Sequence, residues 1–167
     1  MIRIEQSNPF SCLAATAAMI VGSSERDVFD VIGHDGTSLA VVKPFPEVTV
    51  WRDTEHRRPI LIGEIAWYLH TRGFRLGLCA YPITETGQVT GLAFAASTQY
   101  PALLIVDGAN LKHAVFWTGR EVLDPKPGRV GPYDLDDYKI FEWWPVARVA
   151  PWRDSAPGLA RPTSRRH

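Results

Sequence analysis

The first apolar run of the chain has the length and composition of a buried helix. It extends from Cys12 to Val21, is rich in alanine and is apolar on nearly every face. Alanine favours helix formation, and a run that is apolar all round is typical of a helix enclosed by other elements. Ser11 supplies an N-cap residue and Gly22 a helix stop, so the sequence predicts a helix here.

Two further helices are predicted before the pattern changes. Ser24 and Asp27 form an imperfect capping box, and the apolar residues that follow recur on one face until Gly33. Apolar residues also recur with helical spacing over residues 62–71, ahead of Gly73. The sequence therefore predicts a short amphipathic helix followed by a longer one.

After Gly73 the apolar residues alternate with a period of two. Short alternating runs of this kind predict strands, with one helical segment between the first two. The strands are expected at residues 74–80, 101–106, 112–117, 120–124 and 140–148, and the helical segment at 88–97. Because helices precede strands, the order predicts an α+β domain with a mainly antiparallel sheet over residues 1–150.

Two segments lack such a pattern. Residues 33–58 contain several glycines and prolines and a charged stretch, which predicts a long irregular loop with a short strand at 48–51. The segment 151–167 is rich in proline and arginine, so we expect a tail that extends over the surface or is disordered.

Composition limits the classes of partner. The chain has 167 residues, 46% of them hydrophobic, which suits one domain with a real core. Eighteen basic residues balance eighteen acidic ones, so the net charge favours neither nucleic acid nor an anionic membrane nor an acidic substrate. The sequence has neither the pattern of a secretory signal nor an apolar run of membrane-spanning length, so we expect a cytoplasmic protein; its oligomeric state is left open.

Of the two cysteines, Cys12 has the better position for chemistry. A thiol at a helix N-terminus is stabilised as thiolate, the form that attacks a carbonyl carbon. The alternative is a small buried residue in an alanine-rich helix. Cys79 lies in a strand-like run, and nothing in the sequence indicates a disulfide between the two.

A histidine and an aspartate lie on two neighbouring predicted strands. If Thr118 and Gly119 form a two-residue turn, His113 lies directly opposite Asp124, with Cβ atoms about 5 Å apart. The carboxylate can then accept a hydrogen bond from one imidazole nitrogen and leave the other nitrogen for a thiol. The alternative is a chance pair on a surface strand, and a longer turn would shift the register.

The order of these residues resembles a known superfamily. The features are Gln6, then five residues, then Cys12 opening a helix, and later Lys112-His113-Ala114-Val115 and Leu123-Asp124-Pro125. In this order they resemble the papain-like cysteine peptidases, and most closely the bacterial peptidases that remove double-glycine leader peptides. The resemblance extends over residues 4–148.

The resemblance implies a papain-like fold and a role for each residue. Cys12 would be the nucleophile, His113 its base and Asp124 the residue that orients the base, while Gln6 would donate its amide to the oxyanion. The chain differs from the leader peptidases at the nucleophile, where Ser11-Cys12-Leu13 replaces their usual Asp-Cys-Gly.

No metal or cofactor is expected. The histidines outside this set show no metal-ligand spacing with the cysteines; they are His34, His56, His70 and His167. We interpret the acidic run at 133–138 as a solvated turn or short helix, and the aromatic residues from Phe141 to Trp152 as core packing.

The leading hypothesis is a cysteine peptidase that hydrolyses a peptide or isopeptide bond in a peptide or protein substrate. An acyltransferase, a transglutaminase-like crosslinker or a deamidase would use the same thioester. The remaining alternative is a binding module that keeps the papain-like frame without catalysis.

Overall fold

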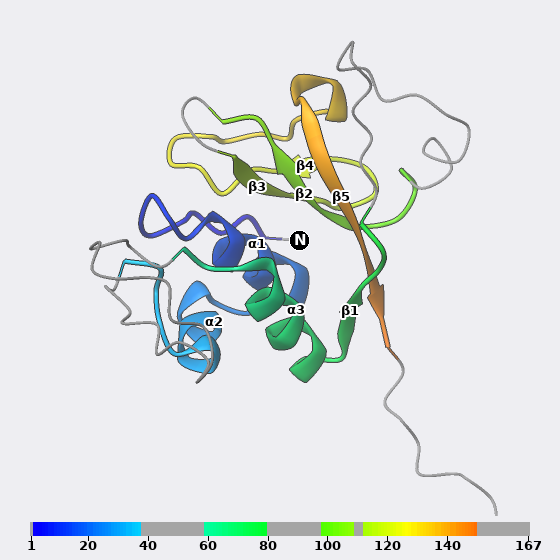
Figure 1. Cartoon of the computed structure of the whole chain (residues 1–167). Coiled ribbons are helices and arrows are strands. Elements are labelled where there is room, and N and C mark those ends of the chain that lie inside the picture. Colours follow the sequence, from blue (N-terminus) through cyan, green and yellow to red (C-terminus); the bar gives the residue numbers. More distant parts are fainter. Residues whose placement is uncertain (1, 38–58, 80–97, 109–111, 150–167) are drawn as a thin grey trace, which may run out of the picture.

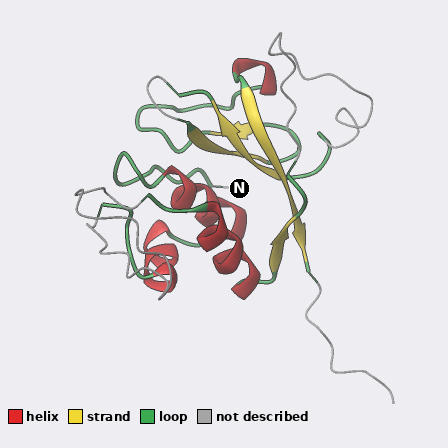
Figure 2. Cartoon of the chain, viewed as in Figure 1, coloured by secondary structure: helices red, strands yellow, loops and turns green. Residues whose placement is uncertain are grey.

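The computed structural model describes residues 2–37, 59–79, 98–108 and 112–149. In these residues three helices lie on one side of a five-stranded antiparallel sheet (Figures 1 and 2). The α+β class predicted from the sequence is therefore confirmed. Within the described part of the chain, no helix is long and apolar enough to cross a lipid bilayer.

The three predicted helices are present. They are α1 (Cys12–Val21), α2 (Glu25–Ile32) and α3 (Ile62–Thr71). Ser24 caps α2 by accepting a hydrogen bond from Asp27 N, as predicted. Ser11 stands at the N-cap position of α1, but its hydroxyl donates to Asn8 O instead of accepting from a helix amide.

The sheet contains five strands in the order β1-β5-β2-β3-β4. They are β1 (Phe74–Leu76), β2 (Ala102–Val106), β3 (His113–Trp117), β4 (Val122–Leu123) and β5 (Ile140–Arg148). The first strand was predicted to continue to residue 80, but β1 ends at Leu76. The next residue, Gly77, lies opposite Pro145 of β5. Proline has no backbone N–H, so the ladder cannot continue.

The β3–β4 hairpin turns one residue later than predicted. The backbone N–H of Thr118 donates to Glu121 O at 3.0 Å, so the turn residues are Gly119 and Arg120. Gly119 has a φ of 94°, and a Cβ there would lie 2.9 Å from Gln99 O. Both the positive φ and the close approach require glycine, which two-residue hairpin loops favour at their first position.

The later turn moves β4 by two residues relative to β3. Trp117 pairs with Val122, so Asp124 does not lie directly opposite His113 and the predicted register is wrong. Side chains alternate between the faces of a strand, so a shift by an even number of residues leaves each one on its original face. Asp124 therefore stays on the same face as His113, at a diagonal position.

The sheet is covered on both faces. The helices form one core with the sheet residues Leu103, Phe116, Leu123 and Val146. The other face carries a second core, against which Tyr133, Leu135 and Tyr138 pack. Trp143 is fully buried in this second core, as the core-packing interpretation predicted.

Four predictions fall outside the described residues. They are the strand at 48–51 with most of its surrounding loop, the helical segment at 88–97, the tail at 151–167 and the packing of Trp152.

Candidate active site

Cys12 is the first residue of α1 and is partly buried. The preceding residue, Ser11, is fully buried, and its backbone N–H and hydroxyl donate to Asn8 O at 3.3 and 3.0 Å. These bonds fix the point at which the helix begins. The unpaired amides of the first helical turn and the helix dipole stabilise a negative charge on a sulfur placed there.

His113 is the first residue of β3, the strand on which α1 packs. Thr16 of α1 donates its hydroxyl to Ala114 O at 3.2 Å, which ties the helix to this strand. His113 Nε2 lies 2.7 Å from Asp124 Oδ1. Because Nε2 contacts the carboxylate, Nδ1 is the nitrogen left for the sulfur of Cys12.

The charge state of His113 reflects both neighbours. Burial lowers the pKa of His113, but hydrogen bonds with Asp124 and Cys12 and the negative charges of both groups outweigh it and raise the pKa to about 9. The imidazole is therefore held as imidazolium near neutral pH.

Asp124 is 2% exposed and its carboxylate is held by several donors. Besides His113, Oδ1 accepts a bond from Lys126 N at 2.8 Å, and Oδ2 accepts one from the Tyr138 hydroxyl at 2.9 Å. Burial raises the pKa of Asp124, but these hydrogen bonds and the charge of His113 lower it by more. The side chain therefore remains a carboxylate in a fixed orientation.

The sequence did not indicate the contact of Tyr138 with Asp124. Tyr138 follows a short 3-10 helix (Leu135–Asp137), which agrees with the short helix expected in the acidic run. The missed signal is the spacing of Tyr133, Leu135 and Tyr138, whose apolar surfaces pack on the second core and carry the Tyr138 hydroxyl to Asp124.

Gln6 lies beside the same residues. Its backbone N–H donates to Pro125 O at 2.8 Å, and its side-chain Nε2 donates to Asn8 O at 2.9 Å. An amide nitrogen carries two hydrogens, so one stays available for a second acceptor. Its Oε1 is buried and accepts no hydrogen bond from the described residues.

The segment that carries Gln6 is anchored at both ends. Arg3 Nε donates to Asp124 O at 2.7 Å, which joins the N-terminal segment to the residue that contacts His113. The carboxylate of Glu25, at the start of α2, accepts a bond from Ser7 N at 3.0 Å. The sequence pattern predicted neither contact, because both join residues far apart in the chain.

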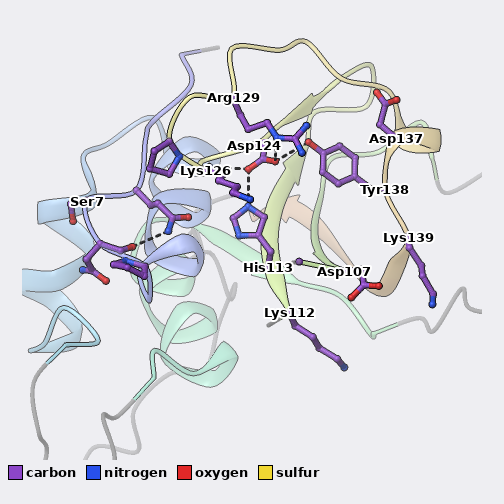
Figure 3. Close-up of a pocket in the computed structure, with 15 residues that line it drawn as sticks. Ser7, Asp107, Lys112, His113, Asp124, Lys126, Arg129, Asp137, Tyr138 and Lys139 are labelled. Carbon is purple, nitrogen blue, oxygen red and sulfur yellow. Dashed lines mark hydrogen bonds and ion pairs between the residues drawn. The ribbon is translucent and has the colours of Figure 1, made fainter. Parts of the chain in front are cut away.

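These residues border a cleft of about 680 Å³. Gln6, His113 and Asp124 line it together with charged residues on either side of them (Figure 3). In Figure 3 the ring of His113 points toward Asp124, and the Tyr138 ring approaches the same carboxylate from the other side. The three sequence-predicted residues Gln6, His113 and Asp124 thus meet at one cleft; Cys12 is not among its lining residues but is close enough to His113 to raise its pKa.

Cys79, His34 and His70 do not line this cleft. Cys79 follows β1, and neither it nor Cys12 is in a disulfide. His34 Nε2 lies 3.1 Å from Glu64 Oε1, and His70 is exposed on α3. No group of three metal-ligating side chains occurs in the ranges that the structure describes; His56 and His167 fall outside them.

Comparison of the chain with protein-family models, with curated proteins and with solved structures finds no match.

The titration of His113 provides a direct test of this geometry. We expect its ring resonances to titrate near pH 9, and both Cys12→Ala and Asp124→Asn to lower that pKa by about one unit or more, because each removes an interaction with the imidazolium. The measurement is an NMR pH titration of the histidine side chains, with His70→Ala as the control that leaves the His113 curve unchanged. A wild-type His113 that titrates at its ordinary value of 6.5 would contradict the contacts described.

The same shift predicts how stability depends on pH. Because the His113 pKa is higher in the folded than in the unfolded chain, its contribution to the free energy of unfolding is complete below pH 6.5 and is lost as the pH rises to about 9. The Asp124 pKa is lowered by folding, so its contribution is lost when the pH falls through that pKa.

Proposed function

We propose that the protein is a papain-like thiol hydrolase that cleaves a peptide or isopeptide bond. The observation that carries the proposal is the position of His113, whose Nε2 lies 2.7 Å from the buried carboxylate of Asp124 and whose pKa is raised by Asp124 and Cys12 together. A nucleophile, a base and a group that orients the base, in that order, are what covalent acyl transfer requires.

The reaction follows from this order. The Cys12 thiolate attacks the carbonyl carbon, and the carbonyl oxygen becomes an oxyanion. The imidazolium of His113 gives its proton to the leaving amine as the C–N bond breaks, which leaves a thioester on Cys12. His113 then takes a proton from water, the hydroxide attacks the thioester, and the C–S bond breaks to release the acid and restore the thiolate.

Gln6 supplies a donor for the oxyanion. Its Nε2 is fixed by Asn8 O, and the hydrogen that this bond does not use can be donated to substrate together with the backbone N–H of Cys12. Preorganised donors of this kind contribute about 2–4 kcal/mol each to transition-state stabilisation.

The papain-like assignment also draws on the arrangement of the chain. Helices come first, the strands follow, and the nucleophile on α1 meets a histidine on β3, in the order that the resemblance to double-glycine leader peptidases implies. We therefore propose a short peptide segment as the substrate.

Cleavage of a peptide library tests this function. Wild-type protein should generate new termini in a proteome-derived peptide mixture, and Cys12→Ala should generate none above background; mass spectrometry of labelled termini is the readout. Incorporation of an added amine without new termini would instead identify an acyltransferase, and conversion of glutamine to glutamate would identify a deamidase. If no new termini appear, no amine is incorporated and no glutamine is converted, only the binding module remains.

Asp124→Asn should keep the fold and lower kcat/KM by about 10²–10⁴-fold, because an amide favours the wrong imidazole tautomer and stabilises the imidazolium poorly. Asp136→Asn is the matched control, since Asp136 is exposed in the 3-10 helix, and it should match wild type. Equal rates for Asp124→Asn and wild type across the pH range would remove Asp124 from the mechanism.

A further inference from the structure

The backbone carbonyl of Asn8 is hydrogen-bonded to both segments that carry the proposed oxyanion donors. Asn8 O accepts a bond from Gln6 Nε2 at 2.9 Å (Figure 3). The same oxygen accepts bonds from the backbone N–H of Ser11 at 3.3 Å and from its hydroxyl at 3.0 Å. Ser11 directly precedes Cys12, whose backbone N–H is the second donor. Asn8 O therefore fixes the Gln6 amide relative to the start of α1.

The side chain of Asn8 holds this carbonyl in place. Asn8 Oδ1 accepts a bond from Phe10 N at 2.9 Å, which closes a local turn of the kind that asparagine side chains form with the backbone two residues on. Asn8 Nδ2 donates to Asp35 O at 3.1 Å, which ties this turn to the segment after α2. The two bonds together restrain both the shape of the turn and its position.

The segment after α2 is itself anchored. The His34 side chain is 7% exposed, its Nε2 lies 3.1 Å from Glu64 Oε1 of α3, and its Nδ1 accepts a bond from Gly36 N at 3.2 Å. A Cβ at Gly36 would lie 3.4 Å from Phe10 O, so this segment packs closely on the turn. The Asn8 side chain thus connects the Gln6 amide to a support that includes α3.

The Gln6 amide depends on this support for its orientation. Among the described residues, its Nε2 donates to Asn8 O, and its buried Oε1 accepts no hydrogen bond. A donor stabilises an oxyanion effectively only when it is aimed at that position before the reaction begins. A displacement of Asn8 O would therefore leave the Gln6 amide without a fixed direction.

We infer that Asn8 is a positioning residue of the oxyanion site, whose side chain holds the carbonyl that aims the Gln6 amide at the substrate. The inference rests on the proposed function and adds a residue that acts through Gln6.

Two reactions of Cys12 distinguish this role from a general structural one. Peptide cleavage places a negative charge on the carbonyl oxygen of the substrate, and the oxyanion donors stabilise that charge. Alkylation by iodoacetamide forms a bond from sulfur to a saturated carbon as iodide leaves, so no oxyanion develops. Loss of Asn8 should therefore slow cleavage and leave alkylation unchanged.

Cleavage and alkylation rates of Asn8→Ala, measured side by side, test the inference. The kcat/KM on a peptide from the library should fall by about tenfold or more, and the alkylation rate of Cys12 should stay within about twofold of wild type. Gln6→Ala should show the same pattern with a loss of about 10²-fold. The double variant should cleave within about threefold of Gln6→Ala, because Asn8 then has no amide to aim.

Thr37→Ala is the matched control. The Thr37 hydroxyl donates to Asp35 Oδ1 at 2.7 Å in the same segment, but this bond does not involve Asn8. Both rates should match wild type. Circular dichroism and thermal unfolding show whether each variant folds; if Asn8→Ala does not, Asn8→Ser, whose hydroxyl can accept from Phe10 N, gives the same comparison.

The outcomes separate the two proposals. Unchanged cleavage in Asn8→Ala, equal losses of cleavage and alkylation, or a double variant whose loss is the product of the two single losses would each overturn the inference and leave the hydrolase in place. No new termini from wild type would overturn the proposed function and the inference with it.

Discussion

Cys12→Ala should abolish peptide cleavage, with a loss of kcat/KM of about 10⁴-fold or more, because no thioester can form without the thiol. The fold should survive, since alanine suits the first turn of an alanine-rich helix and Cys12 is only partly buried. Initial cleavage rates of wild-type and variant protein on a peptide taken from the library are the measurement.

Cys79→Ala is the control for this loss. Cys79 lies after β1 and does not line the cleft, so its removal should leave kcat/KM within about twofold of wild type. If Cys79→Ala lost cleavage and Cys12→Ala retained it, Cys12 would not be the nucleophile.

His113→Ala should lower kcat/KM by about 10⁴-fold or more, because the thiol loses its base and the leaving amine loses its proton donor. The variant should also unfold more easily by about 1–3 kcal/mol, since the buried Asp124 carboxylate loses its closest partner. Cleavage rates and chemical denaturation measure the two effects separately.

The control for this variant is His70→Ala, which replaces an exposed histidine of α3. Its cleavage rate and stability should both match wild type. If His70→Ala and His113→Ala lowered the rate equally, the loss would come from a general disturbance of the fold and His113 would have no special role.

The helices were predicted closely because their signals are local. The apolar run from Cys12, the Ser24 cap and the glycines at positions 22 and 33 act within a few residues, and each helix has the predicted bounds. The strand ends depend instead on their neighbours. β1 stops where it meets Pro145, a residue about 70 positions away in the chain.

The contact between His113 and Asp124 was predicted although the predicted strand register was wrong. The turn at Gly119 was misplaced because the sequence does not show that Gln99 O lies too close for any other residue. Since the resulting shift was even, the face shared by His113 and Asp124 was preserved, and the 2.7 Å bond between them is present. An odd shift would have placed the two side chains on opposite faces of the sheet.

The supporting contacts were not predicted. Tyr138 and Arg3 both donate hydrogen bonds to Asp124. Tyr138 belongs to the acidic run that we interpreted as a solvated turn or short helix, and Arg3 belongs to the N-terminal segment. The Arg3 contact joins positions without any shared periodicity, so only the three-dimensional arrangement reveals it, whereas the spacing of Tyr133, Leu135 and Tyr138 was a signal that we missed. These contacts also explain how a carboxylate just past the end of a two-residue strand is held in one orientation.

The most direct test of the central claim, that His113 activates Cys12, compares the alkylation rates of the two cysteines in one protein. Wild-type protein is treated with low iodoacetamide near neutral pH, and peptide mass spectrometry follows each residue over time. We predict that Cys12 reacts stoichiometrically and at least about tenfold faster than Cys79, and that His113→Ala removes this advantage while His70→Ala preserves it. Slow and equal labelling of Cys12 and Cys79, unchanged in His113→Ala, would contradict the claim.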